Sequence, residues 1–224
     1  GETVIPAVFS ELGERITRSE SKIWFTQGGG MLGPTTEIQN HSRVFSYDAS
    51  LSDSLATPYD DRLCAYNIPT DDVARTGNNQ VIGLAITAKR IWIGEGRGIL
   101  GDRESAISAF IPDPDSCENL LNFDDPQALA SQRLQYCEPG SSAEQDGCIE
   151  KFLLDGPLSK SKVVHLETDP IDDTVWFTDA GGRYLGHANP DRDKVIEVYA
   201  LPDSHANLSV AGGLPWSLRV DDGA

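Results

Sequence analysis

A histidine and an aspartate stand where a predicted β-hairpin would bring their side chains together. His165 and Asp179 are equidistant from Asp172 in the turn-forming run 169–173, so a hairpin centred there places them at one end of adjacent strands. A neutral imidazole beside a carboxylate can act as a general base with an orienting partner, and the carboxylate can hold a cation. A purely structural cross-strand pair is the alternative interpretation, and it is the more common role of such pairs.

Other side chains that could bind a ligand lie near glycine-rich turns. Glu95 follows a tryptophan by three positions, as Asp179 does, and these two carboxylates are the predicted ligands of a divalent ion such as Mg²⁺ or Ca²⁺. The predicted ligand-binding residues are Trp216, Glu95, Arg97 and Arg183. The glycine runs lack the Lys-Ser/Thr pair of a phosphate-binding loop, so we interpret them as hairpin turns.

Some residues of similar chemistry receive a structural interpretation. The acidic turn at 169–173 could bind calcium, but it lacks the twelve-residue spacing of an EF-hand, so we interpret it as a turn former. Three histidines fall in predicted turns, where we expect them to be solvated: His41, His187 and His205.

The strands that must position these residues come from an internal repeat. A tryptophan, a polar or acidic residue three positions later, a glycine-rich turn and a Leu-Gly pair recur at 24–33, 92–101 and 176–186. Short β-prone runs flank each copy, so each unit holds four strands and one tryptophan, which is typical of a propeller blade. We therefore predict an all-β fold, a β-propeller of four-stranded antiparallel blades in which the tryptophans are packing residues.

The repeat is longer than a usual blade because it carries insertions. The tryptophans stand 68 and 84 residues apart, at positions 24, 92 and 176, whereas a blade takes about 40–50 residues. We assign the excess to insertions at 48–61 and 113–147. Residues 215–223 match the first strand of a fourth unit, so the single domain 1–224 holds about three blades and one strand. A ring has typically about four to eight blades, so a longer polypeptide or another chain is expected to supply the remainder.

Charge narrows the range of partners. The 18 Lys and Arg residues against 35 Asp and Glu residues leave a net charge of −17 in 224 residues. Such a chain repels nucleic acid and anionic membrane surfaces, and its apolar runs are far shorter than a membrane helix requires. We expect a small neutral or cationic ligand, or a protein, as the partner.

The cysteines favour an oxidising compartment. None stands in a C-x-x-C pair, and three fall within the second insertion and its border, so we predict disulfides rather than a zinc site. Four cysteines allow three pairings, of which the first to test is Cys137–Cys148 with Cys64–Cys117. Reduced, buried cysteines are the alternative. Asn40 and Asn207 begin N-x-S triplets that would suit glycosylation of a secreted, extracellular or periplasmic, protein.

The third unit resembles the repeats of the streptogramin lyase (virginiamycin B lyase) family of seven-bladed propellers. The resemblance rests on Trp-Phe-Thr-Asp at 176–179, the Asp-rich turn before it and Val-Ile-Glu-Val-Tyr-Ala-Leu-Pro at 195–202. It covers about half of the chain, and propellers with NHL repeats and of the gluconolactonase type share parts of the pattern. In that family the position of His165 supplies the catalytic base, and the position of Asp179 helps to bind magnesium.

The chain also departs from that family. Val163 replaces a carboxylate of the lyase site, and the positions equivalent to the histidine in neighbouring units are Ile82 and Trp216. These departures favour a secreted propeller that acts as a ligand- or partner-binding scaffold. The alternative is a metal-assisted lyase or hydrolase that opens a cyclic ester or lactone, with His165 as general base.

Overall fold

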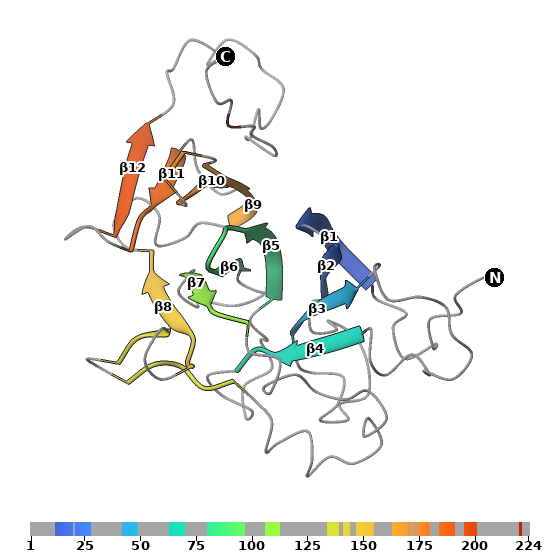
Figure 1. The fold of residues 1–224 in the computed structure, drawn as a ribbon. Helices are drawn as coiled ribbons and strands as arrows, with labels where there is room; N and C mark the ends of the chain where they lie inside the picture. Colours follow the sequence, from blue (N-terminus) through green and yellow to red (C-terminus); the bar gives the residue numbers. More distant parts are fainter. Residues whose placement is uncertain are drawn as a thin grey trace, which may run out of the picture.

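Within the residues that it describes, the computed structural model contains twelve strands in three antiparallel sheets (Figure 1). The first sheet contains β1 (Leu12–Ser19), β2 (Lys22–Gln27), β3 (Arg43–Asp48) and β4 (Leu63–Asn67). The second contains β5 (Gln80–Ile86), β6 (Ile91–Gly96), β7 (Ala106–Phe110) and β8 (Glu150–Leu153). The third contains β9 (Val163–Thr168), β10 (Val175–Asp179), β11 (Tyr184–Ala188) and β12 (Ile196–Ala200). The structure describes residues 12–19, 21–27, 42–48, 63–69, 80–96, 106–112, 134–138, 141–143, 147–154, 163–169, 171–172, 174–179, 184–190, 195–200 and 220.

The arrangement of the sheets is that of propeller blades. In each sheet the four strands follow one another in chain order, and the first strands β1, β5 and β9 lie side by side at the inner edge (Figure 1). The fourth strands β4, β8 and β12 lie at the outer edges. The repeated tryptophans stand on β2, β6 and β10, the second strand of three separate sheets. The predicted all-β propeller architecture is therefore confirmed.

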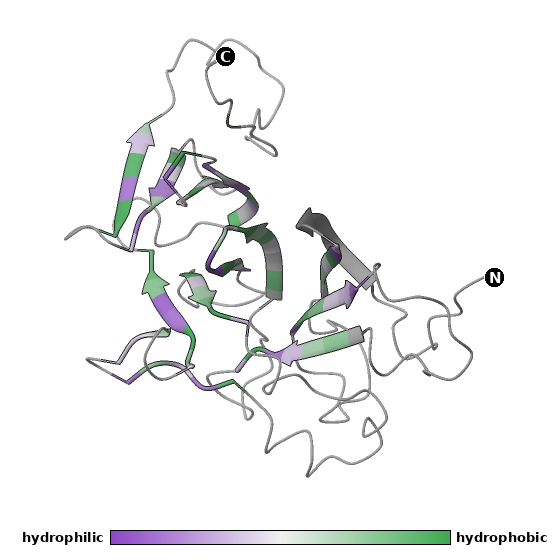
Figure 2. Cartoon of the chain, viewed as in Figure 1, coloured by the Kyte–Doolittle hydropathy of each residue, from purple (hydrophilic) through white to green (hydrophobic). Residues whose placement is uncertain are grey.

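Apolar side chains fill the space between consecutive sheets. Trp24 belongs to a buried cluster shared by the first and second sheets, where its ring stacks 6.0 Å from that of Tyr66. Trp92 is fully buried and belongs to the cluster shared by the second and third sheets, which also contains Phe177. Hydrophobic and hydrophilic residues alternate along a strand and so lie on opposite faces of its sheet, as the green and purple segments of β12 show (Figure 2). The expected packing role of these two tryptophans is confirmed.

Two glycines let the second and third sheets approach closely. A Cβ atom on Gly94 would lie 2.8 Å from the backbone oxygen of Val163 and 2.7 Å from its Cγ1. A Cβ atom on Gly83 would collide with Cδ1 of Leu166. Both contacts are made by β9. The two glycines on β5 and β6, which have no side chain, therefore determine how closely the third sheet packs against the second.

Every inner strand has a register shift near its start. Gln27, Glu95 and Asp179, each three residues after the repeated tryptophan, are the residues at which the pairing with β1, β5 and β9 shifts. In β9 the shift leaves Val164 without an opposite residue, and in β5 it leaves Ile82. Such bulges redirect the side chains beside them.

The predicted facing of His165 and Asp179 is wrong. His165 pairs with Thr178, whereas Asp179 pairs with Val163. The backbone N–H of Asp169 bonds the carbonyl of Thr174 at 2.9 Å, so the hairpin is centred between residues 171 and 172 rather than on Asp172. A slip of one residue moves a side chain to the other face of a sheet.

The two predicted insertions, 48–61 and 113–147, fall between the third and fourth strands of the first and second sheets. Apart from Asp48, the first lies outside the described residues, and the second is described only in its last part. The strand predicted at 215–223 lies outside them except for Val220. In the part of the chain that is described, no helix has the length and hydrophobicity needed to cross a membrane.

Candidate functional site

The structure separates the two residues that the sequence pattern brought together. His165 is partly buried, and its Nε2 lies 3.5 Å from Oε2 of Glu167, two residues along the same strand. Asp179 is 1 % exposed and shares its sheet face with Phe177, which packs toward the second sheet. The imidazole and this carboxylate therefore project from opposite faces of the third sheet. The base-and-orienter pair that we expected between them is not formed.

Glu95 lies inside a polar cluster between the first and second sheets. It is 2 % exposed, and its carboxylate accepts hydrogen bonds from the hydroxyls of Ser108 and Tyr136, the latter at 3.1 Å. Lys151 places Nζ 3.8 Å from Oε2 of Glu95 and 4.6 Å from the centre of the Tyr136 ring. The Tyr136 hydroxyl also lies 3.1 Å from the carbonyl oxygen of Pro69, which follows β4. This cluster joins the second sheet to the end of the first.

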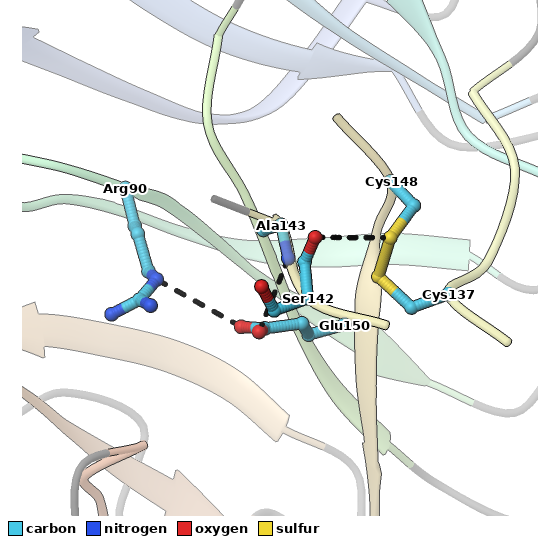
Figure 3. The surroundings of a disulfide bond; sticks show 6 residues. All are labelled: Arg90, Cys137, Ser142, Ala143, Cys148 and Glu150. Atoms are coloured by element: carbon cyan, nitrogen blue, oxygen red, sulfur yellow. Dashed lines mark hydrogen bonds and ion pairs between the residues drawn. A yellow bond between two sulfur atoms is a disulfide. The ribbon is translucent and has the colours of Figure 1, made fainter. Parts of the chain in front are cut away.

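A disulfide fixes the segment that delivers Tyr136 to this cluster. Cys137 and Cys148 are bonded, with Cα atoms 5.0 Å apart, as the sequence predicts (Figure 3). Beside the bond, Tyr136 and Ile149 form a parallel bridge, in which the N–H of Cys137 bonds the carbonyl of Ile149 at 2.9 Å. In Figure 3 the neighbouring Glu150 accepts a bond from the Ala143 N–H at 3.2 Å and lies 3.8 Å from Arg90.

Several predicted site residues lie outside the described part of the chain. Cys64 is disulfide-bonded, but its predicted partner is among the residues that are not described, so that pairing stays a prediction. The other predictions in this group concern ligand binding and glycosylation: Trp216, Arg97, Arg183, Asn40 and Asn207. The metal-binding roles of Glu95 and Asp179 likewise stay predictions.

At the opposite end of the third sheet, a different set of residues comes together. Asp169 and Asp172 lie in the β9–β10 turn, and the strand register places His187 of β11 beside that turn, because His187 pairs with Trp176 and Ala188 pairs with Val175. We expected His187 in a solvated turn, and this is wrong: it is 5 % exposed and lies within a strand. One ligand atom of each acidic side chain and of the imidazole lie within 4.8 Å of one another.

Hydrogen bonds orient both carboxylates of this Asp–Asp–His cluster. Asp169 accepts one bond from the backbone N–H of Ile171 at 2.9 Å and one from Nε1 of Trp176 at 3.1 Å. The Thr174 hydroxyl donates to Asp172 and lies 2.7 Å from Nε2 of His187. The turn is therefore held in one geometry by its own side chains.

The imidazole of His187 is held from two further sides. Its ring stacks on Trp176, with centroids 4.4 Å apart and planes 26° apart. On the far side from the turn, its Nδ1 lies 3.9 Å from Oε2 of Glu197, which in turn accepts a bond from the Tyr199 hydroxyl at 2.7 Å. Three carboxylates thus surround one imidazole, and this arrangement attracts a cation.

Sequence reasoning missed this cluster for an identifiable reason. The residues that follow His187 are rich in turn formers, and for this reason the predicted turn included the histidine. The signal that could have placed it correctly is the Leu-Gly pair at 185–186, because His187 follows it directly and continues the same strand, where it pairs with Trp176.

Comparisons with known proteins give no identification. No protein-family model matches the chain, and no curated protein matches it. Among solved structures, the chain is similar to Drosophila Semaphorin 1a, extracellular domains 1-2, with 13 % identity and a TM-score of 0.39. The match covers 83 % of this chain and 47 % of that one, so the chain spans about half of its length. A likeness this remote carries no argument about activity, and the resemblance to streptogramin lyases stays a prediction.

Proposed function

We propose that the protein is a secreted β-propeller scaffold that binds a ligand or a protein partner. The observation that supports this most directly is the separation of His165 from Asp179 on opposite faces of the third sheet. Glu95, the equivalent carboxylate of the second sheet, is enclosed by two hydroxyls and an ammonium group. These groups hold the sheets together, whereas a catalytic base must face its substrate.

Extracellular location is part of the proposal. A disulfide is present in the structure, Cys64 is also oxidised, and none of the described cysteines is free. Disulfides persist mainly in oxidising compartments. Glycosylation at Asn40 and Asn207 is proposed on the same ground, since both begin N-x-S triplets.

Further blades are the third part of the proposal. Trp24 and Trp92 are buried between their own sheet and the next one. Trp176 has the equivalent position in the third sheet but is only half-buried, and it contacts His187 and Tyr199 of its own sheet. A following sheet, from a longer polypeptide or another chain, would cover it as its counterparts are covered.

A metal-assisted lyase or hydrolase is the second candidate. One observation favours it: the His165 imidazole lies 3.5 Å from Glu167, and a carboxylate at that distance could orient it as a base. The reaction would be the opening of a cyclic ester or lactone, as the resemblance to streptogramin lyases implies.

Ring-opening assays decide between the two functions. A cyclic depsipeptide and a set of lactones are incubated with the wild-type chain, with and without chelator, and with His165→Ala and Glu167→Gln. The scaffold proposal expects the same background rate in every sample. Turnover that requires His165 and is removed by chelator would overturn it in favour of the lyase.

A further inference from the structure

We propose that Asp169, Asp172 and His187 form a binding site for a divalent transition-metal ion, with Zn²⁺ as the best fit. Two segments of the chain supply the donors, the β9–β10 turn and strand β11, and the register of β10 with β11 aligns them. The site lies at the end of the third sheet remote from Asp179, and neither His165 nor Glu167 is one of its ligands, although Glu167 pairs with Trp176 in the same cross-strand row as His187.

The surroundings of His187 point to a ligand on its Nε2 side. A metal-bound histidine almost always has a carboxylate, carbonyl or water on its other ring nitrogen, which fixes the ring and increases its basicity. Here Glu197 stands 3.9 Å from Nδ1, while Nε2 lies 2.7 Å from the Thr174 hydroxyl, which donates to Asp172 of the turn. The Tyr199 hydroxyl holds Glu197 in turn, and the stacked Trp176 ring prevents the imidazole from rotating. This outer set of contacts belongs to different residues from the three proposed ligands.

The turn provides both a fixed ligand and an entry path. Asp169 is fixed by the Ile171 N–H and the Trp176 indole, and each of its oxygens retains a lone pair after accepting one bond. Asp172 is exposed, so an ion can reach it from solvent. The Thr174 hydroxyl now bridges Asp172 and His187. Rotation of this hydroxyl about χ1 would let the ion take the bridging position.

The donor set selects the metal. One imidazole nitrogen and two carboxylate oxygens match a three-ligand zinc site, with Zn–N and Zn–O distances of about 2.0–2.2 Å and solvent in the fourth position. Calcium instead requires about six to eight oxygens. Ligands of a tetrahedral ion at these distances are about 3.4 Å apart, so the side chains, now within 4.8 Å of one another, must close by an ångström or so.

Metal titration of the full chain tests this proposal. After removal of adventitious metal, Co²⁺ is added and its visible absorption is recorded, and Zn²⁺ is then added to displace it; calorimetry gives the stoichiometry. We expect one ion per chain. Asp172→Asn keeps an oxygen to accept the Thr174 bond, and we expect at least tenfold weaker binding. For Glu197→Gln we expect a loss of about 10–100-fold. Glu138→Gln, an exposed control outside the cluster, should bind as the wild type does.

Two outcomes would overturn the site. One is the absence of Zn²⁺ binding by the wild-type chain at about 1 mM ion, which corresponds to a binding free energy weaker than about −4 kcal/mol. The other is unchanged affinity in both Asp172→Asn and Glu197→Gln, which would place the ion elsewhere. Circular dichroism of each variant separates loss of a ligand from loss of the fold, and neither outcome bears on the ring-opening assay.

Discussion

Replacing Gly94 with alanine tests whether close approach of the second and third sheets governs stability. The added methyl group would lie 2.8 Å from the Val163 carbonyl oxygen and 2.7 Å from Val163 Cγ1. The first of these atoms is backbone, at the first residue of β9, which pairs with Asp179, so a change of rotamer cannot relieve the contact. The third sheet must instead move away from β6, which loosens the cluster around Trp92 and Phe177.

The expected magnitude is the balance of two effects. Alanine restricts the unfolded chain more than glycine does, and this alone stabilises the fold by about 0.4–1 kcal/mol. Overpacking a tight interior costs about 1–3 kcal/mol. We therefore expect a net loss of about 1–2 kcal/mol, which corresponds to a fall of about 2–8 °C in the midpoint temperature of a chain of this size.

The assay is thermal and urea unfolding of the wild-type chain and matched variants. Gly83→Ala is the first comparison, because its contact is with the end of the Leu166 side chain, which can change rotamer, so we expect a smaller loss. Gly94→Ala combined with Val163→Ala is the second. It removes Cγ1 but keeps the carbonyl oxygen, so stability should not return. A midpoint for Gly94→Ala at or above that of the wild type would refute the reasoning.

The remaining predictions concern the other contacts between the sheets. Trp92→Ala should lower the free energy of unfolding by about 3–5 kcal/mol, because the indole is fully buried. Trp176→Ala should lower it clearly less, because that indole is only half-buried, and equal urea midpoints for the two variants would contradict this reasoning. Lys151→Ala should destabilise the wild-type chain by about 1–3 kcal/mol, because it leaves the buried Glu95 carboxylate with fewer partners. The same substitution should cost much less in a Glu95→Gln background. Additive losses in this double-mutant cycle would show that the two side chains are not coupled. Tyr136→Phe should cost about 1 kcal/mol in chemical denaturation by removing one donor to Glu95, and an unchanged midpoint would mean that this bond adds nothing. Replacing both Cys137 and Cys148 with serine should lower the free energy of unfolding by about 2–3 kcal/mol, as expected for a disulfide that closes a loop of 11 residues. If a thiol titration of the unreduced, unfolded protein found these two cysteines reactive, the disulfide would be absent.

The architecture follows from the sequence because it depends on a repeated pattern. Three copies of one strand–turn–strand pattern predict three equivalent sheets, and each tryptophan lies on the second strand of its sheet. The Cys137–Cys148 bond was also predictable, since the two cysteines are close in a segment with few other constraints. These features depend only on the order of residues within each repeated unit and on the number of strands in that unit.

The candidate sites depend on details that a pattern does not contain. Whether His165 faces Asp179 or Thr178 is decided by the four-residue loop between Asp169 and Thr174, and the bulge at Val164 decides that Asp179 pairs with Val163. Side chains alternate with a period of two, so an error of one residue puts a catalytic candidate on the wrong face. No sequence rule for this hairpin specifies its centre to within half a residue.

Tertiary packing also brings together groups that are distant in the sequence. Tyr136 reaches Glu95 across 41 positions because a disulfide and a parallel bridge fix its segment beside β8. His187 becomes a buried neighbour of two turn aspartates only through its pairing with Trp176. The sequence by itself determined the blades, their order and the packing role of Trp24 and Trp92. The tertiary structure decided which polar side chains meet, because their meeting depends on register, bulges and the approach of separate sheets.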